Sequence, residues 1–243
     1  MKMLTFSSRV AKEILRDPLN LAFGLGFPIV LLLLMTAIQA NIPVEIFALE
    51  SLTPGIAVFG LSFMTLFSAT IVAKDRSGSL LLRLYTTPLS AADFIAGYTI
   101  PLLPIAVLQC AVCYLVAVLL GLDFTVNIIW AVLLIIPATV FFIALGLLCG
   151  SILTDKQVGG ICGALVTNLS AWLSGAWFDL NLVGGIFKKI AYALPFVRAN
   201  EIGKSALSGN FGDIFPNMFW VLGYAAITAV LAVLLFLRQM DRQ

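Results

Sequence analysis

Four cysteines and the complete absence of histidine limit the chemistry that this chain of 243 residues can perform. Cys110 and Cys113 have the two-residue spacing of a redox or metal-binding pair. No further ligand accompanies them, and like Cys149 and Cys162 they lie in apolar runs, where a free thiol behaves as a small hydrophobic side chain. We interpret all four as packing residues. Without histidine, nucleophilic catalysis by a Ser-His or Cys-His pair is excluded.

The positions of the carboxylates, and a motif that resembles a nucleotide-binding loop, also argue against catalysis by this chain. Nearly every acidic residue, including Asp123 and Asp179, lies in a loop or at the end of an apolar run, so no proton relay at membrane depth is visible. The segment Arg198–Ser205 (RANEIGKS) ends like a phosphate-binding loop, but arginine replaces the first glycine and no strand precedes it. We therefore predict no enzyme activity, cofactor or metal for this chain alone, and expect another chain to bind any ATP and Mg²⁺.

The elements that hold these residues follow from composition. Apolar residues make up 61% of the chain and charged residues 11%, against about 25% charged in soluble domains. A membrane-spanning helix needs roughly 20 apolar residues, because the backbone must satisfy its own polar groups in lipid. We predict an all-α integral membrane protein with one transmembrane domain over residues 1–243. Its six predicted spans are Leu21–Ala40, Leu52–Ala73, Phe94–Leu120, Asn127–Leu153, Gly159–Phe178 and Phe215–Leu237.

Lysine and arginine fix the expected orientation, since these residues concentrate on the cytoplasmic side. Ten of them fall on one side of six spans, in the N-terminal segment, the loop after the second span, the loop at Lys156 and the C-terminal tail. Both termini are therefore expected in the cytoplasm. Four bases are exceptions and lie in the last outer segment: Lys188, Lys189, Arg198 and Lys204. If Gly159–Phe178 did not cross, these four bases would move inside.

The stretch Lys74–Ser90 (KDRSGSLLLRLYTTPLS) interrupts the apolar pattern between the second and third spans. After Gly78 it reads as a short apolar-rich helix that ends before Pro88, because proline disfavours helical backbone in the residue preceding it. Two positions suit such a helix: the membrane interface, or a groove on a soluble partner.

Three patches of sequence resemble the ABC-2 family of transporter permeases, of the type V exporter kind. The first patch is this same stretch, whose matching residues are Asp75, Arg76, Gly78, Leu80, Leu84, Thr86, Thr87, Pro88 and Ser90. The second is the basic N-terminal lead-in with Arg16, Asp17 and Pro18, followed by a first span containing Pro28. The third is Tyr192–Gly209 (YALPFVRANEIGKSALSG). The resemblance covers essentially the whole chain, although Lys74 and Leu82 stand where the family has acidic residues.

The resemblance implies an ATP-driven exporter subunit in the plasma membrane of a prokaryote. A separate ABC ATPase subunit would dock on a coupling helix at Ser79–Thr87, and a second permease copy, identical or related, would complete the pathway for alternating access. No nucleic acid is expected as a partner. The residues expected at the ATPase contact are Asp75, Arg76, Gly78, Leu80, Leu81, Arg83, Leu84, Tyr85, Thr86, Thr87 and Pro88.

The N-terminal helix and the outer segment have two interpretations each. The N-terminal helix (residues 1–18) presents Arg9, Lys12, Glu13 and Arg16, which would contact either the same ATPase or the headgroups of membrane lipids. The outer segment Asp179–Ile214 is too apolar for a free loop and predicts a short re-entrant or interfacial helix before the last span. The family implies a gating role for it, and a passive anchor is the alternative.

The pathway and its cargo are the least readable features. The polar residues expected to line a pathway are Gln39, Ser62, Thr65, Gln109, Thr167 and Asn168. Alternatively, the small polar residues and the glycines of Gly159–Gly175 let helices approach closely. A drug, lipid, glycan or peptide would fit the family, and the near-neutral spans favour an amphipathic cargo. An ion-coupled carrier and a non-transporting scaffold or immunity protein remain alternatives from other classes.

Overall fold

A computed structural model describes residues 2–43, 46–78 and 90–240, and all regular structure in these ranges is helical. The elements are α1 (Lys2–Leu15), α2 (Pro18–Leu21), the π-helix η1 (Ala22–Gly26), α3 (Phe27–Gln39), α4 (Leu49–Ser77), α6 (Ala91–Leu119), α7 (Asn127–Leu134), α8 (Ile136–Ile152), α9 (Asp155–Val158), the π-helix η2 (Gly159–Val166), α10 (Thr167–Leu173), α11 (Leu180–Val183), α12 (Gly185–Ala193), α13 (Pro195–Ser208), the 3₁₀-helix η3 (Phe211–Asp213) and α14 (Ile214–Met240). The predicted all-α fold is confirmed for this part of the chain.

Five helices in the described part of the chain are long and apolar enough to cross a membrane. They are Ala22–Gln39, Leu49–Ser77, Ala92–Leu119, Asn127–Ile152 and Phe211–Arg238, which correspond to five of the six predicted spans. The remaining predicted span, Gly159–Phe178, falls in a helical run over Asp155–Leu173 that lies along α4. Its glycines, Thr167, Asn168 and Ser170 reduce its hydropathy, so a sixth crossing stays a prediction.

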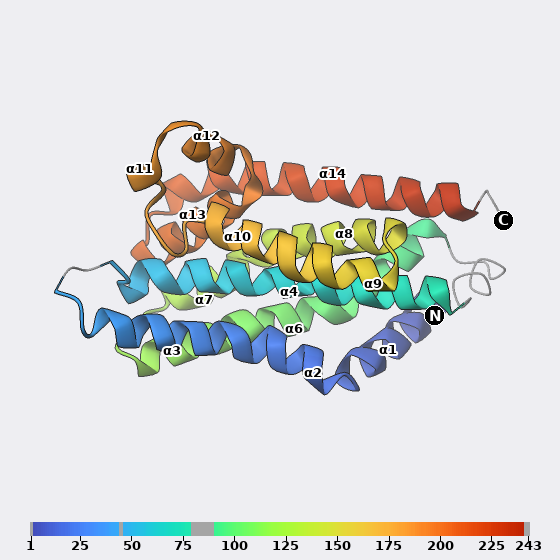
Figure 1. Ribbon diagram of the computed structural model, residues 1–243, viewed down its shortest axis with the longest axis horizontal. Helices are drawn as coiled ribbons and strands as arrows, with labels where there is room; N and C mark the ends of the chain where they lie inside the picture. The colour runs from blue at the N-terminus through green and yellow to red at the C-terminus, as the bar shows by residue number, and fades with distance from the viewer. Residues whose placement is uncertain (1, 44–45, 79–89, 241–243) are drawn as a thin grey trace.

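Helix α4 is the centre of the bundle, with α3, α6, α8, η2 and α10 around it (Figure 1). In its most apolar 18-residue window, 89% of the residues are buried, against 22% for the first span. The helix continues to Ser77, so Lys74, Asp75 and Arg76 belong to its last turns. The prediction that these three residues lie in a loop is therefore wrong, and the reason is that Asp75 and Arg76 find partners inside the protein.

The contact between α4 and α8 depends on two glycines at a spacing of four. A Cβ on Gly146 would overlap the Ser68 hydroxyl and the Thr65 carbonyl, and one on Gly150 would lie 2.6 Å from the Ala69 carbonyl oxygen. Small residues at this spacing let membrane helices pack with their backbones in contact. The alternative interpretation gives this role to Gly159, Gly160, Gly163 and Gly175. A Cβ on Gly159 or Gly160 would meet no atom within 4 Å, whereas one on Gly163 would lie in ordinary contact with Leu66 of α4, at 3.5 Å.

Helix α1 is amphipathic, as predicted, but it uses its apolar face inside the protein. Phe6, Val10 and Ile14 are buried, and the Phe6 ring lies edge-on to Phe94 and Tyr98 of α6, with centroid distances of 5.8 Å and 4.9 Å. The remaining polar face is turned away from α6. Helix α6 itself starts with a capping box in which the Ser90 hydroxyl accepts from the backbone N–H of Asp93.

Different helices lie at the two ends of the bundle. The start of α1, the end of α4, α9 and the end of α14 gather at one end, and α11, α12 and α13 cover the other (Figure 1). The outer segment is thus helical, as predicted, but forms three α-helices and the 3₁₀-helix η3, and its re-entry into the membrane stays a prediction. The phosphate-loop-like residues 198–205 lie within α13, so they do not form a nucleotide-binding loop.

Candidate functional site

A groove of about 560 Å³ opens on the side of the bundle between η1 and α3, α4, and the helical run of η2 and α10. None of the described residues that line it is charged. The residues around it are Phe23, Phe27, Phe59, Phe63, Leu66, Gly159, Gly163, Ala164, Thr167, Asn168, Ala171, Trp172 and Trp177. Several of the rings meet edge to face, among them Phe27 and Phe63 at 5.9 Å and Phe59 and Trp177 at 6.0 Å. Such a lining binds apolar or amphipathic molecules.

Both walls of the groove include π-helical backbone. Phe23 belongs to η1, and Gly159, Gly163 and Ala164 belong to η2. A π-helical turn inserts an extra residue into the helix and is frequent at functional sites. Sequence reasoning missed both, because hydropathy reports the length of a helix and not its hydrogen-bond pattern.

Two of the six predicted pathway residues line this groove. Asn168 is exposed, and its side-chain amide donates to the Ala164 carbonyl at 2.8 Å, while the Thr167 hydroxyl donates to the Cys162 carbonyl at 3.1 Å. Both bonds satisfy a polar group within its own helix. The exposed part of the Asn168 side chain is polar, whereas the rest of the groove surface is mostly aromatic.

The structure places the other four predicted pathway residues outside the groove. The Thr65 hydroxyl donates to the Phe142 carbonyl at 2.7 Å and ties α4 to α8, and the Ser62 hydroxyl donates within α4. Gln109 is buried in α6, where its amide donates to the Cys113 sulfur at 3.4 Å. The side-chain oxygen of Gln39 accepts from two backbone N–H groups after α3, those of Ile46 and Phe47. The hydroxyls of Ser62 and Thr65 and the oxygen of Gln39 are thus hydrogen-bonded inside the protein, whereas the side-chain oxygen of Gln109 is buried without a partner among the described residues.

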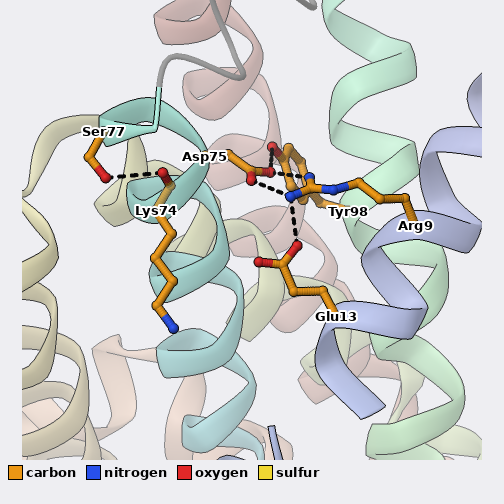
Figure 2. Close-up of polar contacts among 6 residues, drawn as sticks. All are labelled: Arg9, Glu13, Lys74, Asp75, Ser77 and Tyr98. Atoms are coloured by element: carbon orange, nitrogen blue, oxygen red, sulfur yellow. Dashed lines mark hydrogen bonds and ion pairs between the residues drawn. The ribbon is translucent and has the colours of Figure 1, made fainter. Parts of the chain in front are cut away.

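An ion-pair cluster ties α1, α4 and α6 together at the end of the bundle where the chain starts. Figure 2 shows Arg9 of α1 reaching Asp75, with both terminal nitrogens 2.6 Å from the two carboxylate oxygens. The Tyr98 hydroxyl donates to the same carboxylate at 2.8 Å, and Glu13 lies 2.7 Å from Arg9. Asp75 is only 3% exposed. A bidentate arginine pair is strong and fixes geometry, so it holds α1 at a defined angle to α4.

The electrostatics of this cluster favour the charged form of Arg9. The hydrogen bond from Arg9 to Asp75 raises the pKa of Arg9 further above its ordinary value, and the charges of Asp75 and Glu13 act in the same direction, against the effect of partial burial. Sequence reasoning placed Arg9 and Glu13 on an interfacial helix and Asp75 at a partner contact. It missed Tyr98 and the pairing, since both depend on how α1 packs against α6.

Arg76 connects the same end of α4 to α8. Its two terminal nitrogens donate to the carbonyls of Ser151 and Leu153, at the C-terminal end of α8. Helix C-termini carry unpaired carbonyls and partial negative charge, so this arginine caps α8. Lys74 has a different orientation and points away from the cluster, and the Ser77 hydroxyl donates to its carbonyl at 3.0 Å (Figure 2).

Asp75, Arg76 and Gly78 are the only residues of the predicted ATPase contact that the described ranges include. The others lie outside those ranges: Leu80, Leu81, Arg83, Leu84, Tyr85, Thr86, Thr87 and Pro88. Their role in coupling stays a prediction. Asp75 and Arg76 set the end of α4 from which that segment continues.

A smaller polar pocket of about 270 Å³ lies at the opposite end and shares Trp177 with the groove. It is bordered by Asp179, Glu201 and Lys204, and the Lys204 ammonium lies 3.8 Å from the Glu201 carboxylate. Nearby, Arg198 stacks over the Tyr192 and Trp220 rings, at 5.0 Å and 5.8 Å from their centroids. The polar pocket and the groove therefore meet at one tryptophan.

Five long apolar helices, a central buried helix and an uncharged side groove define a multi-pass helical membrane protein. Residues 2–207 match the sequence profile of the ABC-2 type transporter family, so the chain belongs to this family and is a transmembrane transport permease. The match extends from α1 to α13 and confirms the resemblance noted in the sequence. No curated protein sequence matches the chain.

Proposed function

We propose that this chain is the membrane subunit of an ATP-driven exporter that moves an amphipathic molecule along the aromatic groove. The groove is the observation that carries the proposal. It opens sideways, is bordered by the first, second and predicted fifth spans, and combines many rings with one exposed amide at Asn168. A second permease copy facing it would convert an open groove into an enclosed pathway.

The energy source in this proposal is a separate ABC ATPase. Members of the ABC-2 family generally work with ATPase partners. The end of α4 supports a mechanical role, because Arg9, Asp75 and Arg76 connect it to three other helices. A displacement of the segment that follows Gly78 would then be transmitted to α1, α6 and α8 together. With six crossings, the cytoplasm lies at the end of the bundle that holds both chain ends.

Reconstitution with its ATPase tests the proposal. The wild-type chain is expected to raise ATP hydrolysis by the ATPase and to support ATP-dependent uptake of an amphipathic dye into inverted vesicles. Leu81→Asp and Arg83→Glu are each expected to lose most of that stimulation while inserting normally, because they alter the predicted coupling helix.

Leu182→Asp is the matched control, since Leu182 is 82% exposed at the other end of the bundle and is expected to leave stimulation unchanged. Transport by the purified chain without an ATPase would refute the proposal. Equal stimulation by wild type, Leu81→Asp and Arg83→Glu would refute the coupling site.

A further inference from the structure

A basic hollow of about 970 Å³ lies beside α1, and the groove and the ion-pair cluster do not account for it. Its wall is the polar face of α1, continued by Pro18 at the start of α2 and by Lys74 of α4. Phe6, Val10 and Ile14 of α1 are buried in the protein, whereas Leu4 and Leu15 are 60% and 66% exposed, and Leu4 lies at the hollow.

Only some of the charged side chains around the hollow are available to bind a ligand. Arg9 and Glu13 pair with each other, and Arg9 also binds Asp75. Lys12, Arg16 and Lys74 are exposed and form no ion pair with any residue in the described ranges. Three basic side chains from two helices thus line one concave surface, together with the Asp17 carboxylate and the hydroxyls of Thr5 and Ser8.

The hollow lies at the boundary of the apolar layer. Lys74 is in the last turn of the span Leu49–Ser77, and Pro18 comes four residues before the span that begins at Ala22. Phosphate headgroups occupy this depth in a bilayer, and lysine and arginine near a membrane surface attract anionic lipids.

A pocket of about 30 Å³, room for one water molecule, adjoins the hollow beside the span Leu49–Ser77. It has Glu13, Asp17 and Lys74 in common with the hollow, and its remaining lining comes from α1, the end of α2 and α4: Ile14, Leu21, Phe67, Thr70 and Ile71. This pocket is too small for an acyl chain, but Phe67 and Ile71 beside it belong to the span Leu49–Ser77, so a ligand in the hollow lies at the edge of the apolar layer. A lipid headgroup occupies that depth, whereas the acidic surface of a soluble protein stays in the aqueous phase outside it.

From these positions we infer that the hollow binds the headgroup of an anionic phospholipid of the adjoining leaflet, with Lys12, Arg16 and Lys74 contacting the phosphate. This lipid would be held against both α1 and the end of α4, next to the Arg9–Asp75 pair. The inference does not require the proposed transport function, because it concerns a resident lipid.

Competition between two lipids tests the site. The full chain is reconstituted in phosphatidylcholine with phosphatidylglycerol, extracted gently, and analysed by native mass spectrometry for the lipids that it retains. Wild type is expected to retain phosphatidylglycerol in preference to phosphatidylcholine. Replacing Lys12, Arg16 and Lys74 by Gln is expected to reduce this preference, on the order of fivefold for each base removed.

The matched control replaces three bases at the other end, Lys188, Lys189 and Lys204, by Gln and is expected to keep the preference. Lys74→Arg is also expected to keep it, because the charge remains. The inference is overturned if the first triple variant retains phosphatidylglycerol as wild type does, or if both triple variants lose it equally. It is equally overturned if the first variant instead loses only ATPase association in pure phosphatidylcholine, since the hollow would then be a protein-docking surface.

Discussion

The carboxylate of Asp75 is the most consequential single group in the described structure, because one buried side chain joins three helices. Asp75→Asn removes the charge but keeps the shape, which leaves Arg9 without its main partner. We expect a loss of about 2 kcal/mol in the free energy of unfolding, the usual range for a hydrogen-bonded pair involving charged groups. Thermal unfolding of the purified protein in detergent measures it as a lower Tm.

A double-mutant cycle separates the pair from general damage. Arg9→Gln and Asp75→Asn are expected to be non-additive, with a coupling energy on the order of 1 to 2 kcal/mol, because contacting residues share one interaction. Lys12→Gln is the control on the same helix, since Lys12 is exposed and should be additive with Asp75→Asn. Additive losses for Arg9 and Asp75 would mean that the bidentate contact contributes nothing measurable.

Residue-level features were predictable from sequence only where the partner is near in the chain. The exposure of Asn168 follows from an amide in an apolar run, and the capping box at Ser90 and Asp93 follows from their spacing. The pairing of Arg9 with Asp75 joins residues 66 apart, and nothing in the local pattern at either position indicates it. An acidic residue beside an arginine at the end of an apolar helix is the signal that would have raised the question.

At the scale of elements, Gly146 and Gly160 are expected to respond in opposite ways to substitution by alanine, because only Gly146 lies in the close contact between α4 and α8. Gly146→Ala places a methyl group against the backbone of α4 and is expected to destabilise the protein by about 2 kcal/mol or more, as overpacking does. The methyl group of Gly160→Ala would lie in open space, and alanine favours the helix over glycine by up to about 1 kcal/mol. The Tm of the monomeric variant should therefore equal or exceed that of wild type.

The same unfolding assay compares the two variants in monodisperse detergent samples. A loss of stability for Gly160→Ala equal to that for Gly146→Ala would contradict the packing described here and would indicate a tightly covered η2.

Hydropathy and helix length predicted most spans to within a few residues, because lipid imposes both. They could not predict which glycine contacts which helix, or that η1 and η2 are π-helical, because these depend on packing between helices.

At the scale of the whole molecule, the side of the membrane on which the later segments lie depends on whether the helical run Asp155–Leu173 crosses the membrane. The end of α4 and helix α12 lie at opposite ends of the bundle (Figure 1). The chain between them holds the candidate spans Ala92–Leu119 and Asn127–Ile152, and the run would be a third crossing. Ser77→Cys and Ile186→Cys place thiols at these two ends, at exposed positions, and Ile186 is 76% exposed. A membrane-impermeant maleimide applied to intact spheroplasts is expected to label Ile186→Cys and, only after permeabilisation, Ser77→Cys.

The wild-type chain is the background control, because its four cysteines are buried or only partly exposed. Three crossings between the two positions put them on opposite sides, whereas two put them on the same side. If both thiols react from outside, or both require permeabilisation, the run does not cross and Lys188, Lys189, Arg198 and Lys204 share a compartment with α1. The groove would then have a wall that stops within the membrane, and an enclosed pathway between two copies would have to be built from the first two spans alone.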